Sequence, residues 1–139
     1  MNMIFIDASG QILGRLCSVV AKRLLDGEEV TVVNAEKALV TGNRDDILED
    51  FRWRRRVGSQ RKGPYYPRRP DMILKRSIKG MLPHKRTRGR EALNRLKVYV
   101  AVPDEFTKKK LVNIKEASSE GLESFITLEE ISKHLGAEF

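Results

Sequence analysis

The sequence predicts a single α/β domain into which a basic, extended arm is inserted. Three observations lead to this prediction. Residues 3–33 read as strand, helix and strand, because two short apolar runs flank one amphipathic segment. The chain has 139 residues, the size of one ordinary domain with its own hydrophobic core. Its positive charge is concentrated in a central segment that contains several Gly and Pro and few aliphatic side chains.

The first predicted unit covers the N-terminal quarter of the chain. Residues 3–6 are apolar and precede the turn-forming residues 7–10, which predicts a buried strand. Apolar residues then recur at helical spacing over residues 12–25, and Asp26-Gly27 ends the predicted helix. The β-branched residues 30–33 predict a second strand. Because a helix connects the two strands, we expect them to be parallel, with a right-handed crossover.

A third short strand is predicted over residues 37–41, before Gly42. Asn43 then has the side chain of a helix N-cap, and Asp45 and Asp46 suit the positive end of a helix. The helix that follows should run through residue 56, losing its apolar face as Arg residues take over.

The second half of the chain should contain shorter elements. A helix should start after Asp71 and end before Pro83, and a second helix should cover residues 90–96. A strand over residues 97–102 should follow. A last helix should begin at a capping box, Thr127–Glu130, and end at Gly136. We expect residues 104–139 to form a C-terminal helical tail on the same domain.

The net charge of +8 comes entirely from a basic block, residues 52–90. Fifteen of the 27 Lys and Arg residues lie in this block together with one acid, Asp71, whereas acids outnumber bases on both sides of it. A surface that is merely soluble mixes both signs, so this distribution favours a polyanionic partner. Arg outnumbers Lys in the block, which suits bidentate contacts with phosphate oxygens, and aromatic side chains lie among the charges, which suits stacking on unpaired RNA bases.

We therefore predict an RNA-binding surface made by the arm and the helices next to it. The predicted RNA-binding residues are Arg52, Trp53, Arg54, Arg55, Arg56, Arg61, Lys62, Tyr65, Tyr66, Arg68, Arg69, Arg76, Lys79, Lys85, Arg86, Arg88 and Arg90.

The arm, residues 57–70, is predicted to be an extended loop. Its Gly residues allow the backbone to approach a phosphate closely, and its Pro residues lower the entropic cost of an extended conformation. A disordered linker is the alternative interpretation.

Residues 10–15 lie between a predicted strand and a predicted helix, where open α/β folds bind phosphates. They lack the third Gly of a dinucleotide site and the Lys of a P-loop, so a tight turn at Gly10 and close helix–sheet packing at Gly14 are the preferred explanation. Asp7 and Asn34 end neighbouring strands, where ligands can bind, but are more simply turn and cap residues.

No catalytic, metal or cofactor site is predicted. His84 and His134 are far apart in the sequence, and Cys17 lies on the apolar face of the first helix, which indicates a core residue. A single Cys fits a reducing compartment, and the chain has neither a long apolar segment nor a basic, apolar start. We therefore expect a cytoplasmic protein without membrane contacts.

Several motifs resemble one known family, the universal large-subunit ribosomal protein thirteen family, in its archaeal and eukaryotic branch. The resembling residues, in family order, are Asp7-Ala8, Leu13-Gly14-Arg15-Leu16, Val33-Asn34-Ala35-Glu36-Lys37, Val40-Thr41-Gly42-Asn43, Gly80-Met81-Leu82-Pro83, Gly89, Ala92, Leu96 and Lys97-Val98-Tyr99. One departure is Ala101, which stands where the family leads us to expect Gly.

The resemblance implies a small parallel sheet of four strands flanked by helices, in a structural constituent of the large ribosomal subunit. The partners it implies are large-subunit ribosomal RNA and neighbouring ribosomal proteins, without catalysis, cofactor or obligate homo-oligomer. An RNA-modifying or nucleotide-dependent enzyme, with a cofactor at the strand ends, is the alternative hypothesis. A regulatory role outside the ribosome stays open.

Overall fold

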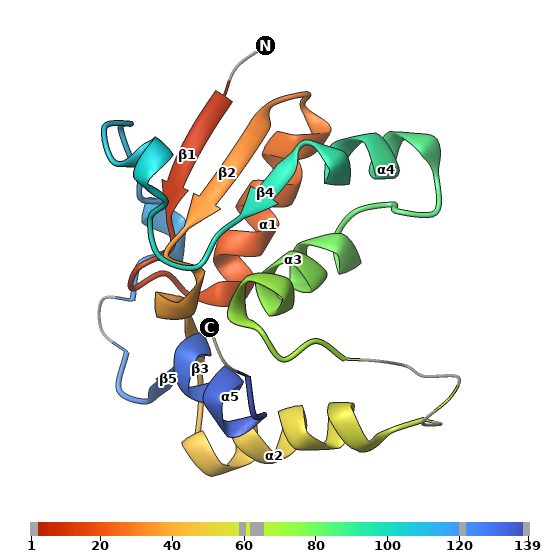
Figure 1. Ribbon diagram of the computed structural model, residues 1–139, viewed down its shortest axis with the longest axis vertical. Coiled ribbons are helices and arrows are strands. Elements are labelled where there is room, and N and C mark those ends of the chain that lie inside the picture. The colour runs from red at the N-terminus through yellow and green to blue at the C-terminus, as the bar shows by residue number, and fades with distance from the viewer. Residues whose placement is uncertain (1–2, 59–60, 62–65, 120–121, 138–139) are drawn as a thin grey trace.

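A parallel sheet of three strands forms the centre of the computed structural model, which describes residues 3–58, 61, 66–119 and 122–137 (Figure 1). Strands β1 (Met3–Asp7), β2 (Glu29–Val33) and β4 (Leu96–Val98) lie in the order β1-β2-β4. Helix α1 (Leu13–Leu25) connects β1 to β2, and both neighbouring strand pairs are parallel. The predicted α/β class and the strand–helix–strand unit are confirmed.

The two faces of this sheet are covered differently. Helices α3 (Pro70–Gly80) and α4 (Thr87–Asn94) pack with α1 and bury a core of aliphatic side chains between helices and sheet. On the other face, the rings of Phe5 and Tyr99 contact the ring of Phe106, with centroids 5.1 and 5.5 Å apart. Phe106 ends a short 3₁₀ helix, η2 (Asp104–Phe106). The central strand β2 is therefore buried on both sides, as in other parallel sheets, whereas Met3 of β1 and Lys97 of β4 remain exposed.

The parallel sheet differs from the four strands that the family resemblance implied. Residues 37–41 do contain a strand, β3 (Leu39–Thr41), but it pairs antiparallel with β5 (Phe125–Thr127) in a second, small sheet. The chain leaves the first sheet because Asn34 has a left-handed backbone and the 3₁₀ helix η1 (Ala35–Lys37) follows it. At the β1 edge, a single parallel bridge between Ile6 and Val112 stands where a fourth strand would lie.

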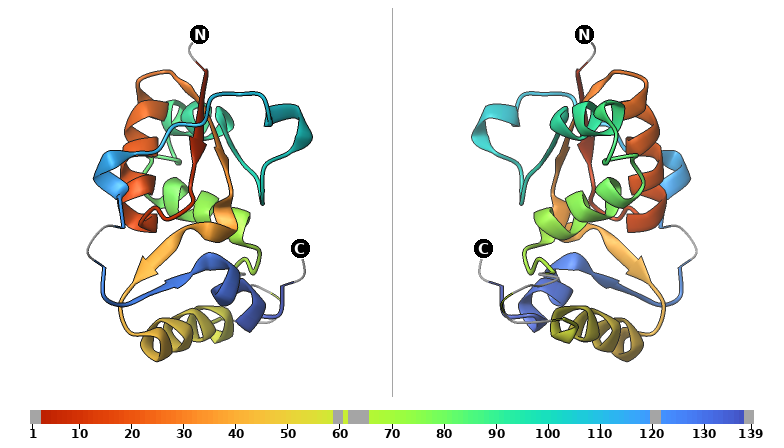
Figure 2. Two further views of the ribbon diagram at one scale, coloured as in Figure 1. Left: turned by 90° about the vertical axis from the view of Figure 1, so that its left-hand side faces the viewer. Right: turned by 90° about the vertical axis from the view of Figure 1, so that its right-hand side faces the viewer.

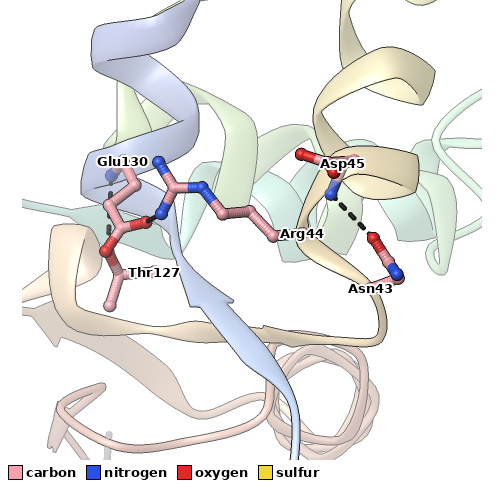
Figure 3. A network of polar contacts seen from close by, with 5 residues as sticks. All are labelled: Asn43, Arg44, Asp45, Thr127 and Glu130. Atoms are coloured by element: carbon pink, nitrogen blue, oxygen red, sulfur yellow. Dashed lines mark hydrogen bonds and ion pairs between the residues drawn. The ribbon is translucent and has the colours of Figure 1, made fainter.

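The second sheet carries helices α2 (Arg44–Arg56) and α5 (Leu128–His134), and these elements lie together at one end of the molecule (Figure 2). Both predicted N-caps are confirmed. The Asn43 side chain accepts a hydrogen bond from the Asp45 amide at 2.9 Å, and Thr127 Oγ1 accepts one from the Glu130 amide at 3.3 Å (Figure 3). An ion pair between Arg44 and Glu130 joins the first turns of the two helices.

Residues after 104 form more than the expected helical tail, since they contain η2, a further 3₁₀ helix η3 (Lys115–Ala117), β5 and α5. They are also anchored in the core. The Ile114 amide donates to the side-chain oxygen of Gln11 at 3.1 Å, and the Ile12 amide donates to the Ala117 carbonyl at 2.7 Å. Ile114 and Ala117 are buried beside α1. This segment therefore belongs to the same hydrophobic core as the N-terminal unit.

Two helix boundaries differ from the predicted ones. Helix α3 begins at Pro70, because Pro is favourable at a first helical position. Helix α4 begins at Thr87, three residues before the predicted start, so the last Arg residues of the basic block lie on a helix. The strand after it, β4, is shorter than predicted and ends at Val98.

Ala101 occupies a conformation that suits glycine. Its φ is +58°, in the left-handed region. Two hydrogen bonds accompany this backbone conformation. The Ala101 amide donates to the buried Glu36 carboxylate at 2.9 Å, and the Asn34 amide donates to the Ala101 carbonyl at 3.1 Å. The family expectation of Gly at this position therefore has a physical reason, and Ala carries strain there.

We expect Ala101→Gly to raise the free energy of unfolding by about 0.5–1 kcal/mol. Removing the Cβ relieves roughly 1–2 kcal/mol of left-handed strain, and the greater freedom of Gly in the unfolded chain offsets part of this gain. Urea denaturation measures the difference. Ala101→Val is the matched control and should lower stability, because a β-branched residue tolerates positive φ less well. Equal stability of all three proteins would contradict the strain.

Candidate nucleic-acid interface

The predicted RNA-binding residues that the structure describes lie on α2, at residue 61 and the end of the arm, on α3, in the turn after it and on α4, and these helices follow one another around one side of the molecule (Figure 1). Nearly all of their charged side chains that the structure describes are exposed. Lys62 and Tyr65 lie outside the described residues. The single acid of the block, Asp71, forms an ion pair with Arg69 at 3.4 Å. The remaining cations of this side face solvent and give it a strongly positive surface.

Tyr66 brings α2, the arm and α3 together. Its ring meets Phe51 of α2 edge to face, with centroids 5.9 Å apart. The guanidinium groups of Arg54 and Arg76 lie over the Tyr66 ring, 5.6 and 4.8 Å from its centroid, and Arg55 donates a hydrogen bond to the Tyr66 carbonyl. The sequence predicted Tyr66 as a stacking surface for RNA bases. It did not reveal these intramolecular contacts, which anchor the end of the arm.

The charge around Tyr66 is not balanced. Partial burial, and then the neighbouring charge of Arg68, lower the pKa of the Arg55 guanidinium below its usual value. Arg54 does have an acidic partner, Asp50, at 2.9 Å. Repulsion between Arg55 and Arg68 nevertheless remains at the place where the arm leaves α2. An external anion such as a phosphate would relieve this repulsion.

Trp53 is available on the same helix. Its side chain is 58% exposed, although Trp is usually well buried. A groove of about 280 Å³ connects it with Tyr66 and Arg76. An exposed indole among guanidinium groups is a suitable face for an unpaired base.

Two of the predicted arginines, Arg52 and Arg56, are exposed and have no hydrogen bond or ion pair to other residues that the structure describes. We expect Arg52→Ala/Arg56→Ala to weaken binding to large-subunit ribosomal RNA about tenfold or more while leaving the melting temperature nearly unchanged. Filter binding and thermal denaturation measure the two effects.

Arg54→Ala/Arg55→Ala is the matched comparison on the same helix. The sequence alone predicts that this pair also leaves stability unchanged. Because both side chains contact Tyr66, we now expect the double variant to lower the melting temperature as well as the affinity. A stable Arg54/Arg55 variant, or an unfolded Arg52/Arg56 variant, would show that the two pairs have been assigned the wrong roles.

At the strand ends, the Asp7 carboxylate is engaged by residues of the protein itself. The Asn34 side chain donates to Asp7 Oδ1 at 3.0 Å, and the Ser9 amide donates to the same oxygen at 2.9 Å. Burial of Asp7 acts to raise its pKa, but these hydrogen bonds outweigh that effect and the pKa lies below its usual value. Asp7 thus serves as a turn residue, as preferred from the sequence. Asn34 stands at the N-cap position of η1, but its side chain makes no cap hydrogen bond and contacts Asp7 instead.

The two glycines of the first loop have different explanations. Gly10 has a φ of +69°, which confirms the tight turn. The prediction of close helix–sheet packing at Gly14 is wrong, because Gly14 is exposed and an added Cβ would meet no atom within 4 Å. Gly14 lies on the solvent side of α1, one residue from the half-buried Leu13.

Cys17 is a core residue, as predicted. It is fully buried, its Sγ lies 3.9 Å from the Leu74 carbonyl, and burial raises its pKa to about 12. In the described part of the chain, no three His, Cys, Asp or Glu side chains are arranged to hold a metal ion. Among the described helices, none is both long and apolar enough to cross a membrane.

The sequence analysis did not identify a second group of cations. Lys108, Lys109 and Lys110 are exposed beyond η2, and the Lys109 ammonium lies 6.0 Å from the centroid of the Phe5 ring. The three successive lysines are visible in the sequence, but they lie in the C-terminal third of the chain, where acids outnumber bases, so the net charge there did not indicate a basic surface. These lysines lie after the parallel sheet and are separate in sequence from the basic block.

Comparison with known protein families identifies the family to which this chain belongs. The family model described as Ribosomal protein L13 matches residues 1–105. The chain belongs to this family.

Similar proteins named large ribosomal subunit protein uL13 occur in several archaea. The one from Methanosarcina barkeri is 52% identical over 99% of this chain and its own full length. That from Thermoplasma acidophilum is 52% identical over 94% of this chain and 96% of its own. That from Methanocaldococcus jannaschii is 49% identical over 99% of this chain and its own full length. The suspected family and its archaeal-type branch are confirmed.

The L13 match includes the whole basic block, and the full-length relatives extend it to the C-terminal segment. One L13 motif residue has a clear structural reason. Gly89 is buried in the first turn of α4, where an added Cβ would lie 2.0 Å from the Pro83 carbonyl oxygen. Another, Gly80, has no such constraint, because a Cβ there would meet no atom within 4 Å.

Proposed function

We propose that this L13-family protein is a structural constituent of the large ribosomal subunit that binds and stabilises large-subunit ribosomal RNA and supports its assembly. The observation that carries the proposal is the run of mostly exposed cations over residues 52–90, which cover the end of α2, the arm, α3 and the start of α4, with one acid, Asp71, among them. Relatives that are about half identical over nearly their full length and are named large ribosomal subunit proteins support the same role. Neighbouring ribosomal proteins are the further partners proposed.

The mechanism follows from the division between core and surface. The α/β core holds α2, α3 and α4 in fixed positions, and their cations replace the counterions of phosphates where RNA segments pack together. The proposed RNA-binding residues are those predicted from the basic block. Arg54, Arg55 and Arg76 also position the arm through Tyr66, so they act partly by holding other residues in place.

An RNA-modifying or nucleotide-dependent enzyme is less well supported. Such an enzyme would use the ends of the parallel strands. There, the carboxylate of Asp7 is already engaged by Asn34 and Ser9. Family membership also favours the structural role.

Co-sedimentation tests the proposal. The full chain, expressed with a tag in the cells from which it comes, should sediment with the large subunit in sucrose gradients. The purified protein should bind purified large-subunit ribosomal RNA. Sedimentation at the top of the gradient would overturn the proposal. Turnover of RNA with an added nucleotide cofactor would favour the enzyme instead.

A further inference from the structure

An open groove of about 780 Å³ lies between the end of the arm, α3 and α4. Its volume falls within the roughly 300–1,000 Å³ typical of small-molecule sites. One part of its wall is apolar and is formed by Tyr66, Met72 and Leu93. Met72 is 52% exposed, so this wall faces solvent rather than the core. The groove therefore offers flat, apolar contact area on an otherwise charged surface.

The rest of the groove is positively charged. Lys75, Arg76 and Lys79 line it from successive turns of α3, and both lysines are exposed. None of its lining residues among those the structure describes is acidic. The occupant that fits this wall combines an apolar face with negative charge.

Gly80 forms part of the groove, and the fold does not require glycine there. It is the last residue of α3, its φ is not positive, and an added Cβ would meet no atom within 4 Å. Glycine weakens a helix at such a position. Gly89 differs, since the fold leaves no room for its Cβ. The free space above Gly80 is therefore space in the groove.

His84 adds a polar group to the same wall. Its Nδ1 lies 3.3 Å from the Lys79 carbonyl oxygen, and in the tautomer with the proton on this nitrogen it can donate a hydrogen bond there. In the neutral ring Nε2 is then an acceptor. An acceptor beside an apolar face suits a partner that has both a flat ring and an N–H group.

We propose that the groove receives one unpaired nucleobase of RNA, with the phosphates beside that base on Lys75 and Lys79. The groove next to Trp53 shares Tyr66 and Arg76 with it, so one strand of RNA can contact both. A base provides the apolar face, its neighbouring phosphates provide the charge, and its N–H groups can meet His84. The inference rests on the proposed function and specifies one RNA contact.

Substitutions that fill the groove test this inference. Gly80→Ala, Gly80→Leu and Gly80→Phe should fold at least as stably as the wild type, because the space above Gly80 is free of protein atoms. Affinity for purified large-subunit ribosomal RNA should fall in that order, to about one tenth or less for Phe. Gly14→Phe is the matched control, since it also places a ring over an exposed helical glycine with free space, and should bind like the wild type.

Two further measurements identify the occupant. Ultraviolet crosslinking of the wild-type complex should join RNA to peptides that contain Tyr66, Met72 or His84, and Gly80→Phe should abolish these crosslinks. Nucleoside monophosphates should shift the amide resonance of Gly80, whereas ribose 5-phosphate at the same concentration should shift it much less.

The outcomes separate the inference from the proposed function. If the wild type binds no ribosomal RNA, the proposed function fails. If RNA binds but both Gly80→Leu and Gly80→Phe leave its affinity and crosslinks unchanged, the base-binding groove is overturned alone. Equal shifts with ribose 5-phosphate would reduce the groove to a phosphate site. Crosslinks from the groove to a ribosomal protein in purified subunits would show a protein occupant.

Discussion

Raising the salt concentration from about 50 to 200 mM should weaken binding of this protein to large-subunit ribosomal RNA about a thousandfold. The reason is the composition of the basic block, which has fifteen cations and one acid. If roughly six to eight of these cations neutralise phosphates, each releases counterions on binding, and the logarithm of affinity falls by about 0.7–0.9 per phosphate for each unit in the logarithm of salt concentration. Filter binding over a series of salt concentrations measures the slope.

Arg52→Ala/Arg56→Ala provides the control for this experiment. Each phosphate contact that is lost should reduce the magnitude of the slope by roughly one, so the double variant should show a shallower dependence. A nearly flat titration of the wild type would contradict a binding surface dominated by phosphate contacts. An unchanged slope in the double variant would remove these two residues from that surface.

Local patterns in the sequence predicted several elements of the fold correctly. The strand–helix–strand unit and both N-caps depend on neighbouring residues, such as Asn43 with Asp45, and each was found. The pairing of β3 with β5 was not predicted, because it joins Val40 to Ile126 and no local pattern encodes so distant a contact. The left-handed turn at Asn34, which directs the chain out of the parallel sheet, was missed for a different reason: Asn adopts this conformation more often than most residues, but its presence does not fix it.

The sequence identifies the region of the candidate interface, but it does not show what each residue of that region contacts. Charge density identifies the basic block directly, since its side chains must face solvent or an anion. Charge density does not show which cations are already engaged. Arg54 and Arg56 look alike in sequence and both are exposed, yet Arg54 contacts Phe51 and Tyr66, whereas Arg56 has no hydrogen bond or ion pair to other residues that the structure describes. The contacts of Tyr66 within the protein were not predicted, because its partners come from two different helices.

Gly89, one of the L13 motif residues, lies where the fold leaves no room for a side chain. The chain turns after α3, and the Pro83 carbonyl accepts a hydrogen bond from the Arg86 amide at 2.9 Å. The first turn of α4 lies directly against this carbonyl. A Cβ on Gly89 would lie 2.0 Å from its oxygen and 2.8 Å from the His84 nitrogen, and both obstacles are backbone atoms that cannot rotate away. Any side chain at this position must displace either the turn or the helix.

We expect Gly89→Ala to lower the free energy of unfolding by about 3 kcal/mol or more, the upper range for overpacking in a buried site. Gly80→Ala is the matched control in the neighbouring helix. It should raise stability by up to about 1 kcal/mol, because Ala favours a helix and the space is free. Urea denaturation of both variants measures the contrast. Gly89→Ala should also weaken RNA binding in the fraction that folds, since the displaced helix carries Arg88 and Arg90. Equal stability of the two variants would show that α4 can move away from Pro83 at little cost, and the packing reason for Gly89 would then be wrong.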